Sequence, residues 1–429
     1  MSEVAQAPHS SPDGHIPQLR FPEFSGEWGR KLFNNIVDII DGDRGVNYPK
    51  SNDFFNDEYC LFLSAKNVTK NGFIFNETQF ITKERDALLR KGKLSRGDIV
   101  LTTRGTVGQF AFYSDDVLYD NIRINSGMVL LRNNNDNLLN SYFFKACKSF
   151  QISRQIKIVA FGSAQPQLTV KEINKIKISL PAKPEQQKIA AFLTAVDAKI
   201  EQLIKKKELL DEYKKGLMQQ IFSQAIRFKA DDGSDFPDWK EKKLENVLKR
   251  TSTGLNPRQN FKLGYGENYY VTIKNISNGK LDFSKCERID ENAMTMIANR
   301  SDLSKGDLIM SSIGNVGESY LLDKEPENWN INESVFMLRA SELMLPQFLY
   351  FIITNEQSKW YLESNSTGSS FKSIKLGELK LLPLGLPSLE EQTKIANFLS
   401  SIDTKIEQVG KQLDESKQFK KALLQQMFV

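Results

Sequence analysis

The feature that most constrains this chain is a segment of 44 residues that occurs twice. Residues 180–223 and residues 386–429 align without a gap at an offset of 206, and 21 of the 44 positions are identical. Self-similarity at a fixed distance along the chain indicates an internal duplication. Each copy of the segment follows a longer block, so the sequence predicts the order block, repeat, block, repeat.

Each copy of the repeat has the pattern of an unusually long helix. Mostly apolar residues recur at alternating steps of four and three, which is the heptad spacing of a coiled coil. Pro184 suits the first turn of a helix and Ser388 with Glu391 forms a capping box, so both helices should start just after a Leu-Pro pair. The positions of the seam are Ile189, Leu193, Val196, Ile200, Leu203, Lys207, Leu210, Lys214, Leu217 and Ile221, and then Ile395, Leu399, Ile402, Ile406, Val409, Leu413, Ser416, Lys420, Leu423 and Met427.

Two ordinary core helices are the alternative to a coiled coil. The length of the repeat and its strict spacing exceed what a compact core needs, and one such helix cannot bury its seam alone. We therefore expect the two long helices to be each other's main partner.

Composition indicates a soluble globular chain of several domains. The chain has 429 residues, of which 40% are apolar and 26% charged, and it contains no apolar run long enough to span a membrane. Residues 1–16 have the composition of a disordered cytosolic tail and lack the pattern of a secretion signal. The three scattered cysteines, Cys60, Cys147 and Cys286, fit neither a disulfide framework nor a metal site. We expect a cytoplasmic protein without membrane association.

The sequence offers no set of catalytic residues. Its only histidines, His9 and His15, lie in the expected tail, so the folded part has no imidazole for base catalysis or zinc binding. Neither a phosphate-binding loop of the G-x-x-x-x-G-K-[ST] type nor a dinucleotide-binding G-x-G-x-x-G after a strand is present. We expect neither a catalytic site, nor a metal, nor a cofactor in this chain.

Charge is distributed unevenly between the two blocks. Residues 17–183 contain 24 Lys and Arg against 17 Asp and Glu, a local excess of seven positive charges, whereas residues 224–385 contain 21 against 22. An excess of positive charge makes a polyanion such as nucleic acid a plausible ligand of the first block.

The two blocks share a pattern of short strands and turns. Leu-Ser-x-Gly-Asp occurs at residues 94–98 and 303–307, and in both places it leads into a strand that ends in a Gly-x-Val-Gly loop. Each block then closes with a small helix (141–148 and 346–354), a Gly-Ser loop and a final strand ending in Leu-Pro. We expect an α+β fold of pseudo-twofold symmetry, with mixed α/β blocks at residues 17–180 and 227–386 and long helices at residues 181–226 and 387–429.

These motifs resemble the specificity subunits of type I restriction-modification systems. The resemblance is carried by Leu-Pro-x-x-x-Glu-Gln-x-Lys-Ile-Ala-x-Phe-Leu with Asp-x-Lys-Ile-Glu-Gln after it, at residues 180–202 and 386–408. The Leu-Ser-x-Gly-Asp strands and a Phe-Pro-x-x-x-x-x-Trp motif at the start of the first block support it.

The resemblance implies a non-catalytic subunit that addresses an enzyme complex to its DNA. Each block would be a target-recognition domain for one half of a bipartite, asymmetric site in double-stranded DNA, and the long helices would pack antiparallel and set the gap. Two methyltransferase (modification) subunits, which bind S-adenosylmethionine, and restriction/translocase subunits, which use ATP and Mg, would be the partners.

Candidate DNA-binding residues follow from their place in loops and from side chains that can hydrogen-bond to base edges. For each of them a solvated or turn-capping role is the alternative. The candidates are Lys66, Asn67, Arg104, Thr106, Ser163 and Gln165 in the first block, and Lys274, Asn275, Ser312, Asn315, Ser369 and Lys372 in the second. A basic run nearby, Arg90, Lys91, Lys93 and Arg96, is expected to contact phosphate if it contacts DNA at all.

Two other functions fit the same sequence. One is a coiled-coil scaffold whose blocks bind proteins, and the other is the specificity subunit of a system that only modifies DNA.

Overall fold

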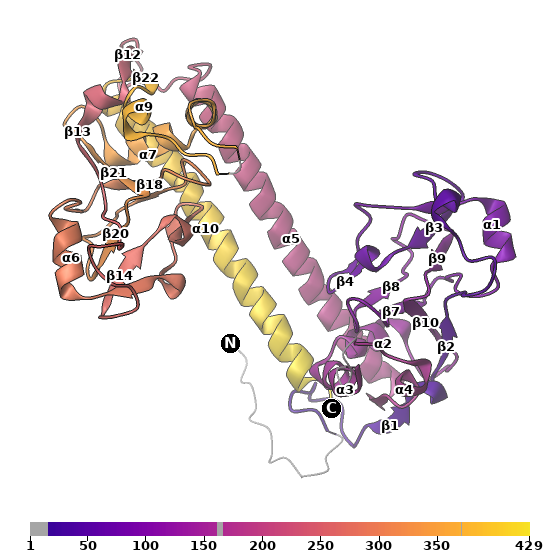
Figure 1. The fold of residues 1–429 in the computed structure, drawn as a ribbon. Helices are drawn as coiled ribbons and strands as arrows, with labels where there is room; N and C mark the ends of the chain where they lie inside the picture. Colours follow the sequence, from indigo (N-terminus) through magenta and orange to yellow (C-terminus); the bar gives the residue numbers. More distant parts are fainter. Residues whose placement is uncertain (1–15, 161–165, 370) are drawn as a thin grey trace. The chain divides into compact units, whose positions relative to one another are not determined.

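A computed structural model of the chain describes residues 16–160, 166–369 and 371–429 (Figure 1). The two histidines and all but the last residue of the expected tail lie outside this part of the chain. The described residues form two compact units. Unit 1 comprises the residues up to Ile204 together with Lys411–Val429, and unit 2 comprises Lys205–Gly410.

Unit 1 is built on a four-stranded antiparallel sheet of order β2-β10-β7-β8. A second sheet, of order β6-β3-β9, pairs β3 with β9 in parallel and with β6 antiparallel. The strands of these sheets are β2 (Val37–Asp41), β3 (Cys60–Leu63), β6 (Phe80–Ile81), β7 (Ile99–Thr102), β8 (Phe110–Phe112), β9 (Ile122–Ile124) and β10 (Met128–Asn133). The remaining elements are the strand pairs β1 (Gly29–Leu32) with β11 (Lys177–Leu180) and β4 (Val68–Thr69) with β5 (Gly72–Phe73), and the helices α1 (Lys83–Leu88), α2 (Asn140–Cys147), α3 (Phe150–Ala160) and α4 (Val170–Ile173).

Unit 2 repeats this topology strand for strand. Its four-stranded sheet has the order β13-β21-β18-β19, and its three-stranded sheet, β17-β14-β20, again contains one parallel pair, β14 with β20. The strands are β13 (Leu248–Thr253), β14 (Asn268–Val271), β17 (Glu287–Ile289), β18 (Leu308–Ser311), β19 (Ser319–Leu321), β20 (Trp329–Ile331) and β21 (Val335–Ala340). The remaining elements are the pairs β12 (Lys240–Lys243) with β22 (Pro383–Leu386) and β15 (Ile276–Ser277) with β16 (Lys280–Leu281), and the helices α6 (Glu291–Ala298), α7 (Pro346–Thr354), α8 (Glu356–Ser364) and α9 (Leu376–Lys380).

The two repeats form the long helices α5 (Lys183–Phe222) and α10 (Leu389–Gln426), which stand out as rods in Figure 1. Both begin just after the Leu-Pro pair, as the sequence predicts. All twenty seam positions are buried or half-buried, while most of the positions between them are exposed. The heptad prediction is therefore confirmed.

Each unit contains one end of each long helix, and the two ends run antiparallel. In unit 1 the apolar core includes Ile189 and Leu193 from the start of α5, Leu423 from the end of α10, and Met427, which follows α10. In unit 2 the core joins Ile221, at the end of α5, to residues at the start of α10. The predicted α+β class with two repeated blocks and long antiparallel helices is confirmed.

The two seam lysines near the helix ends form ion pairs inside their own units. Lys420 Nζ lies 2.6 Å from Asp197 Oδ1 in unit 1, and Lys214 Nζ lies 2.6 Å from Asp403 Oδ1 in unit 2. Each pair joins one long helix to the other, so the lysines contribute to the antiparallel contact at positions where the apolar seam is interrupted.

The duplicated Glu-Gln pair at the start of each long helix has a structural role. Glu391 is 0% exposed and accepts hydrogen bonds from Nε of Arg227 (3.2 Å), Nη2 of Arg227 (2.9 Å) and Nε1 of Trp239 (3.0 Å). Gln392, also 0% exposed, accepts from Leu345 N (2.9 Å) just before α7. In unit 1, Glu185 and Gln186 make the corresponding bonds to Arg20 and to Leu139 N. Each pair thus ties the start of a block, and the loop before its first closing helix, to a long helix.

The expected capping box of the second long helix forms only in part. The hydroxyl of Ser388 accepts from Glu391 N at 3.2 Å, but the Glu391 carboxylate is directed to Arg227 and Trp239. The ion pair with Arg227 takes the place of the reciprocal bond to the backbone.

Candidate nucleic-acid interface

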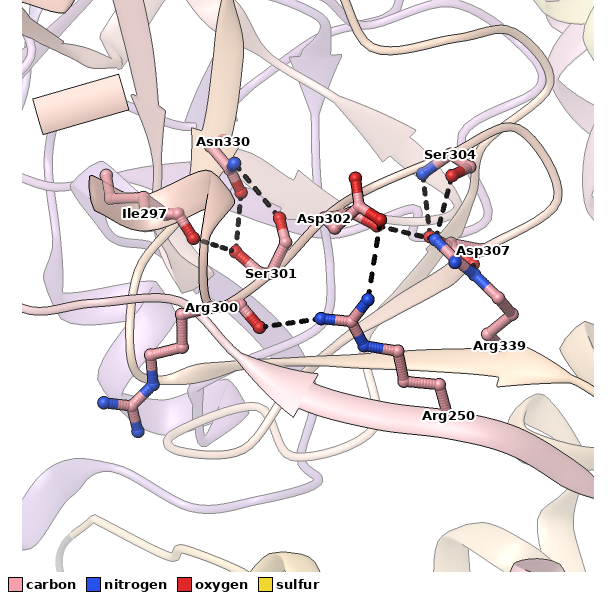
Figure 2. Close-up of polar contacts among 9 residues, drawn as sticks. All are labelled: Arg250, Ile297, Arg300, Ser301, Asp302, Ser304, Asp307, Asn330 and Arg339. Atoms are coloured by element: carbon pink, nitrogen blue, oxygen red, sulfur yellow. Dashed lines mark hydrogen bonds and ion pairs between the residues drawn. The ribbon is translucent and has the colours of Figure 1, made fainter. Parts of the chain in front are cut away.

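The Leu-Ser-x-Gly-Asp motif holds the strand that leads to the predicted recognition loop. In unit 2 the Asp307 carboxylate is 0% exposed and accepts from Ser304 N (2.8 Å), Arg339 Nε (2.7 Å) and Arg339 Nη2 (2.8 Å), as Figure 2 shows. The hydrogen bonds that Arg339 donates to Asp307 also raise the pKa of Arg339, which stays charged. In unit 1, Asp98 binds Ser95 N and Arg132 in the same way.

A second buried contact fixes the turn just before this motif in unit 2. Ser301 is 0% exposed, and its hydroxyl donates to Asn330 Oδ1 at 2.8 Å while Asn330 Nδ2 donates back to Ser301 O at 3.2 Å (Figure 2). Beside it, Arg250 and Asp302 form a looser ion pair of 3.5 Å at the surface. The start of β18 is therefore held on both sides by buried polar contacts.

The last residue of β7, Thr102, holds both ends of the loop between β7 and β8. Thr102 is 0% exposed, and its hydroxyl donates to the Thr106 carbonyl and accepts from Gln109 N (2.9 Å). Gly105 and Gly108 have φ of 70° and 87°, a conformation that favours glycine. In unit 2, the Ser311 hydroxyl donates to the Asn315 carbonyl in the same manner. Each loop therefore presents its tip to solvent on a fixed backbone.

A second predicted segment meets this loop in each unit, and a third meets it in unit 2. A Cβ atom placed on Gly105 would lie 4.0 Å from Cβ of Ala65, which begins the 3-10 turn Ala65–Asn67, and one on Gly314 would lie 3.7 Å from Cδ1 of Ile273 in the turn Ile273–Asn275. In unit 2, Lys372, which follows the Gly-Ser loop, accepts a hydrogen bond from Gly314 N through its backbone O at 2.8 Å. The structure thus brings together all three predicted segments in unit 2, and in unit 1 the two that lie within the described residues.

Three predicted residues have a role different from base contact. Asn67 and Asn275 are each 2% exposed. Asn67 Oδ1 accepts from Ser64 N (2.8 Å) and its Nδ2 donates to Glu77 O (2.8 Å), while Asn275 Oδ1 accepts from Thr272 N (2.9 Å). Ser312 is 4% exposed and its hydroxyl donates to Ser334 O at 2.7 Å. Their polar atoms stabilise the turns from inside, so we remove these three from the set of base-contact candidates.

The other described candidates are exposed at the surface of their unit. Lys66 forms an ion pair of 2.6 Å with Glu77 in which both side chains are more than two-thirds exposed. The remaining exposed candidates are Arg104, Thr106, Lys274, Asn315, Ser369 and Lys372. The predicted residues Ser163 and Gln165 lie outside the described residues. Whether the exposed side chains contact bases stays a prediction.

The basic run of the first block divides into two pairs. Lys93 forms an ion pair with buried Asp86 at 2.6 Å, and Arg96 donates to Ser114 O (2.6 Å) and to Asp120 (2.8 Å), so both serve the fold. Arg90 and Lys91 are exposed and keep their charged groups at the surface.

Two exposed residues near the loops escaped the sequence prediction. Arg44 follows β2 in the sequence Gly-Asp-Arg-Gly, and this turn pattern could have indicated an exposed arginine. Phe371 is 75% exposed between the candidates Ser369 and Lys372, where an aromatic residue in a polar loop was the signal.

Two kinds of reactive group are at issue among the described residues, metal-binding clusters and cysteine thiols. No group of three or more His, Cys, Asp or Glu among them could hold a metal ion, and burial raises the pKa of the Cys60 thiol to about 12 and of the Cys286 thiol to about 11. Thiols with such pKa values are poor nucleophiles at neutral pH. Across the described ranges, no helix is both long and apolar enough to cross a membrane.

Comparison with known proteins gives one consistent result. The family described as "Type I restriction modification DNA specificity domain" matches the chain twice, at residues 32–211 and 237–415. The chain is 25% identical over 365 residues to the type I restriction enzyme MjaVIII specificity subunit of Methanocaldococcus jannaschii, covering 81% of this chain and 79% of that protein. It is 21% identical over 396 residues to the EcoBI specificity subunit of Escherichia coli, with 82% and 80% covered.

Solved structures agree with these matches at the level of the fold. The S subunit of a type I restriction-modification system from M. genitalium superposes with a TM-score of 0.58 at 16% identity, covering 96% of this chain and 99% of that one. A chain from a study of complex assembly and conformational transition of the type I R-M system gives a TM-score of 0.55 at 17% identity, with 97% and 98% covered.

Proposed function

Because this chain belongs to the family of type I restriction-modification DNA specificity subunits, we propose that its two units read the two halves of a bipartite, asymmetric DNA site. The chain is the non-catalytic recognition subunit of its system, and family membership decides against a scaffold that binds only proteins. In this proposal unit 1 reads one half-site through the loops around Lys66, Arg104 and Thr106, and unit 2 reads the other through the loops around Lys274, Asn315 and Lys372.

The observation that carries the proposal is a shared buried frame with different exposed tips. Asp98 and Thr102 in unit 1 correspond to Asp307 and Ser311 in unit 2 at an offset of 209, and they make the same internal bonds. At the tips of the same loops the residues differ, with Arg104 facing solvent where unit 2 has Ile313, and Thr106 where it has Asn315. Two copies of one scaffold with different tips are suited to reading two different base sequences.

The long helices support the remaining part of the proposal. Helices α5 and α10 contain 40 and 38 residues, and at 1.5 Å per residue each would be nearly 60 Å long. We propose that they set the gap between the half-sites and carry two methyltransferase subunits, with the restriction/translocase subunits joining that assembly. S-adenosylmethionine, ATP and Mg would then bind to those partners, and the cytoplasm would be the site of action.

A block exchange combined with methylation mapping tests this proposal. The gene is expressed with its modification genes in a host without adenine methylation, and methylated adenines are mapped across the genome. Replacing residues 17–180 with the corresponding block of another specificity subunit should change one half of the methylated sequence. Replacing residues 227–386 should change only the other half.

A change in both halves after a single exchange would refute independent reading by the two units. A system that only modifies DNA differs in its partner subunits, so it gives the same methylation result and is distinguished by the absence of restriction of unmethylated phage DNA.

A further inference from the structure

Three exposed cationic residues lie near the recognition loop of unit 1. Arg104 N donates to Gly127 O at 3.2 Å, and Arg44 Nη2 donates to Ser126 O at 3.3 Å, so the turn at residues 126–127 lies between these two arginines. At Gly45, the residue after Arg44, an added Cβ atom would lie 3.4 Å from Arg90 Nη2. Lys91 follows Arg90 and is exposed as well. We call Arg44, Arg90 and Lys91 the basic strip.

The backbone under the strip is fixed by one buried aspartate. Asp43 is 8% exposed and accepts from Gly45 N (2.8 Å) and Arg90 N (2.8 Å). The backbone bonds from Gly45 and Arg90 hold the pKa of Asp43 below its usual value, so the carboxylate stays charged beneath the strip. The Asp43 carboxylate accepts its hydrogen bonds from backbone N–H groups. Among the described residues, the only carboxylate that forms an ion pair with the strip is the half-buried Asp41, 3.1 Å from Arg44. Arg90 and Lys91 thus have no ion-pair partner among the described residues. The Arg44 side chain is 48% exposed, and both of its bonds, to Asp41 and to Ser126 O, come from Nη2.

At the matched positions unit 2 carries one positive charge where unit 1 carries three. Asp41 pairs with Val129, the second residue of β10, and Thr253 pairs with Phe336, the second residue of β21, so Asp41 and Thr253 are equivalent. Gly42 and Gly254 follow them in closely packed turns. Arg44 therefore corresponds to Asn256. The Leu-Ser-x-Gly-Asp offset of 209 matches Arg90 and Lys91 with Asn299 and Arg300. Two of the three cations of the strip are asparagines in unit 2, and Arg300 donates to Thr253 Oγ1 at 3.2 Å.

We propose that the basic strip binds the phosphate backbone of the DNA next to the half-site read by unit 1, and that the matched positions of unit 2 make no equivalent set of phosphate contacts. This inference rests on the proposed function. Contacts between Lys or Arg and phosphate carry no sequence information but supply much of the affinity, and they make it depend on salt. The chain then holds its DNA unevenly: unit 1 supplies most of the electrostatic affinity, and unit 2 contributes mainly base discrimination.

The test measures binding of the full chain to a fluorescent 40-base-pair duplex of random sequence over a series of salt concentrations. A strip variant (Arg44→Gln, Arg90→Gln, Lys91→Gln) is compared with a control variant of unit 2 (Arg258→Gln, Lys262→Gln, Arg300→Gln). All three control residues are exposed, and both variants lose three positive charges, so the net charge of the chain changes equally. Circular dichroism and thermal melting verify that both variants are folded.

Each lost phosphate contact should reduce the slope of log K against log salt by about 0.9. The strip variant should therefore show a slope smaller in magnitude by about 2 to 3. Between 50 and 200 mM salt, the factor by which its affinity falls should then be about fortyfold smaller than for the wild type. The control variant should change the slope by less than about 1.

Equal changes in the two variants, or a larger change in the control, would overturn the proposal while leaving DNA binding by the chain intact. If the wild-type chain binds no duplex even at the lowest salt concentration, both this inference and the proposed function are wrong. In that case the block exchange should leave both halves of the methylated sequence unchanged. If only the inference about the basic strip is wrong, the block exchange should still change one half.

Discussion

The substitution Glu391→Gln tests what the duplicated Glu-Gln pair does. Glu391 is fully buried in the first turn of α10, where its carboxylate holds Arg227 and Trp239 from the start of the second block. Glutamine has the same shape but carries no charge and only one acceptor oxygen. The change therefore removes the ion pair and one hydrogen bond without opening a cavity.

The expected cost follows from these contacts. Breaking a buried ion pair by neutralising one partner costs about 3–5 kcal/mol, because the other charge stays behind. The Arg227 side chain is 24% exposed, so water compensates part of the loss and the lower end of this range applies. The lost bond from Trp239 adds about 1 kcal/mol. We expect Glu391→Gln to lower the free energy of unfolding of unit 2 by about 3–4 kcal/mol.

Hydrogen exchange resolves this effect by position and urea unfolding gives its size. Amide protection of residues 226–239 and of the first turns of α10 should fall by about two to three orders of magnitude, while peptides of unit 1 keep their protection. The matched control is Glu390→Gln, which removes the same charge from the same helix turn but at an exposed position, and should cost less than about 1 kcal/mol. Equal costs for the two variants, or unchanged exchange in residues 226–239, would refute the role assigned to Glu391.

Three further predictions concern reading, spacing and acid stability. Arg104→Ala should relax the sequence preference at one base pair of the first half-site by about 1–3 kcal/mol in binding to a panel of duplexes, whereas uniform weakening would identify a phosphate contact. Insertion of one heptad in the middle of α5 should change the gap between the methylated half-sites and leave the half-sites themselves unchanged; an unaltered gap would exclude the helices as the spacer. Burial would raise the pKa of Asp86, but hydrogen bonds from Lys93 and Arg123 hold this pKa below the ordinary value of 3.8. The ionised carboxylate therefore stabilises unit 1 above pH 3.8, and this stabilisation is lost as the pH falls through the lower pKa of the folded state. In acid titrations followed by circular dichroism, Asp86→Asn should be less stable than wild type at pH 7 by about 3–5 kcal/mol, and should lose less stability below pH 4.

The long helices could be predicted from the sequence because heptad spacing is a local signal repeated many times. The partners of Lys214 and Lys420 could not, since they depend on which residue of the antiparallel helix lies opposite. The ion pairs with Asp403 and Asp197 follow from that register, which only the folded units define.

The recognition loops show where sequence reasoning about a site fails. Lys66 and Asn67 are neighbours in one turn, and both side chains can hydrogen-bond to DNA. Asn67 instead closes a capping box with Ser64 and is buried, a pattern that Ser-x-x-Asn in this sequence could have indicated. Arg44 was missed because it lies far along the chain from Arg104 and reaches the same surface only through the turn at residues 126–127. The segments that form the surface could be predicted, but the exposure of each side chain required the fold.

The composition of unit 1 has a consequence for synthesis on the ribosome. Its core includes Leu423, Met427 and Phe428, while the residues of unit 2 form one uninterrupted stretch, Lys205–Gly410. Unit 2 can therefore complete its core while translation continues, but unit 1, although made first, waits for the final turn of α10 to leave the exit tunnel. During that interval the nascent first block exposes the apolar surface that Phe428 will cover. A premature stop codon that removes only the last turn should therefore damage the block that was translated first.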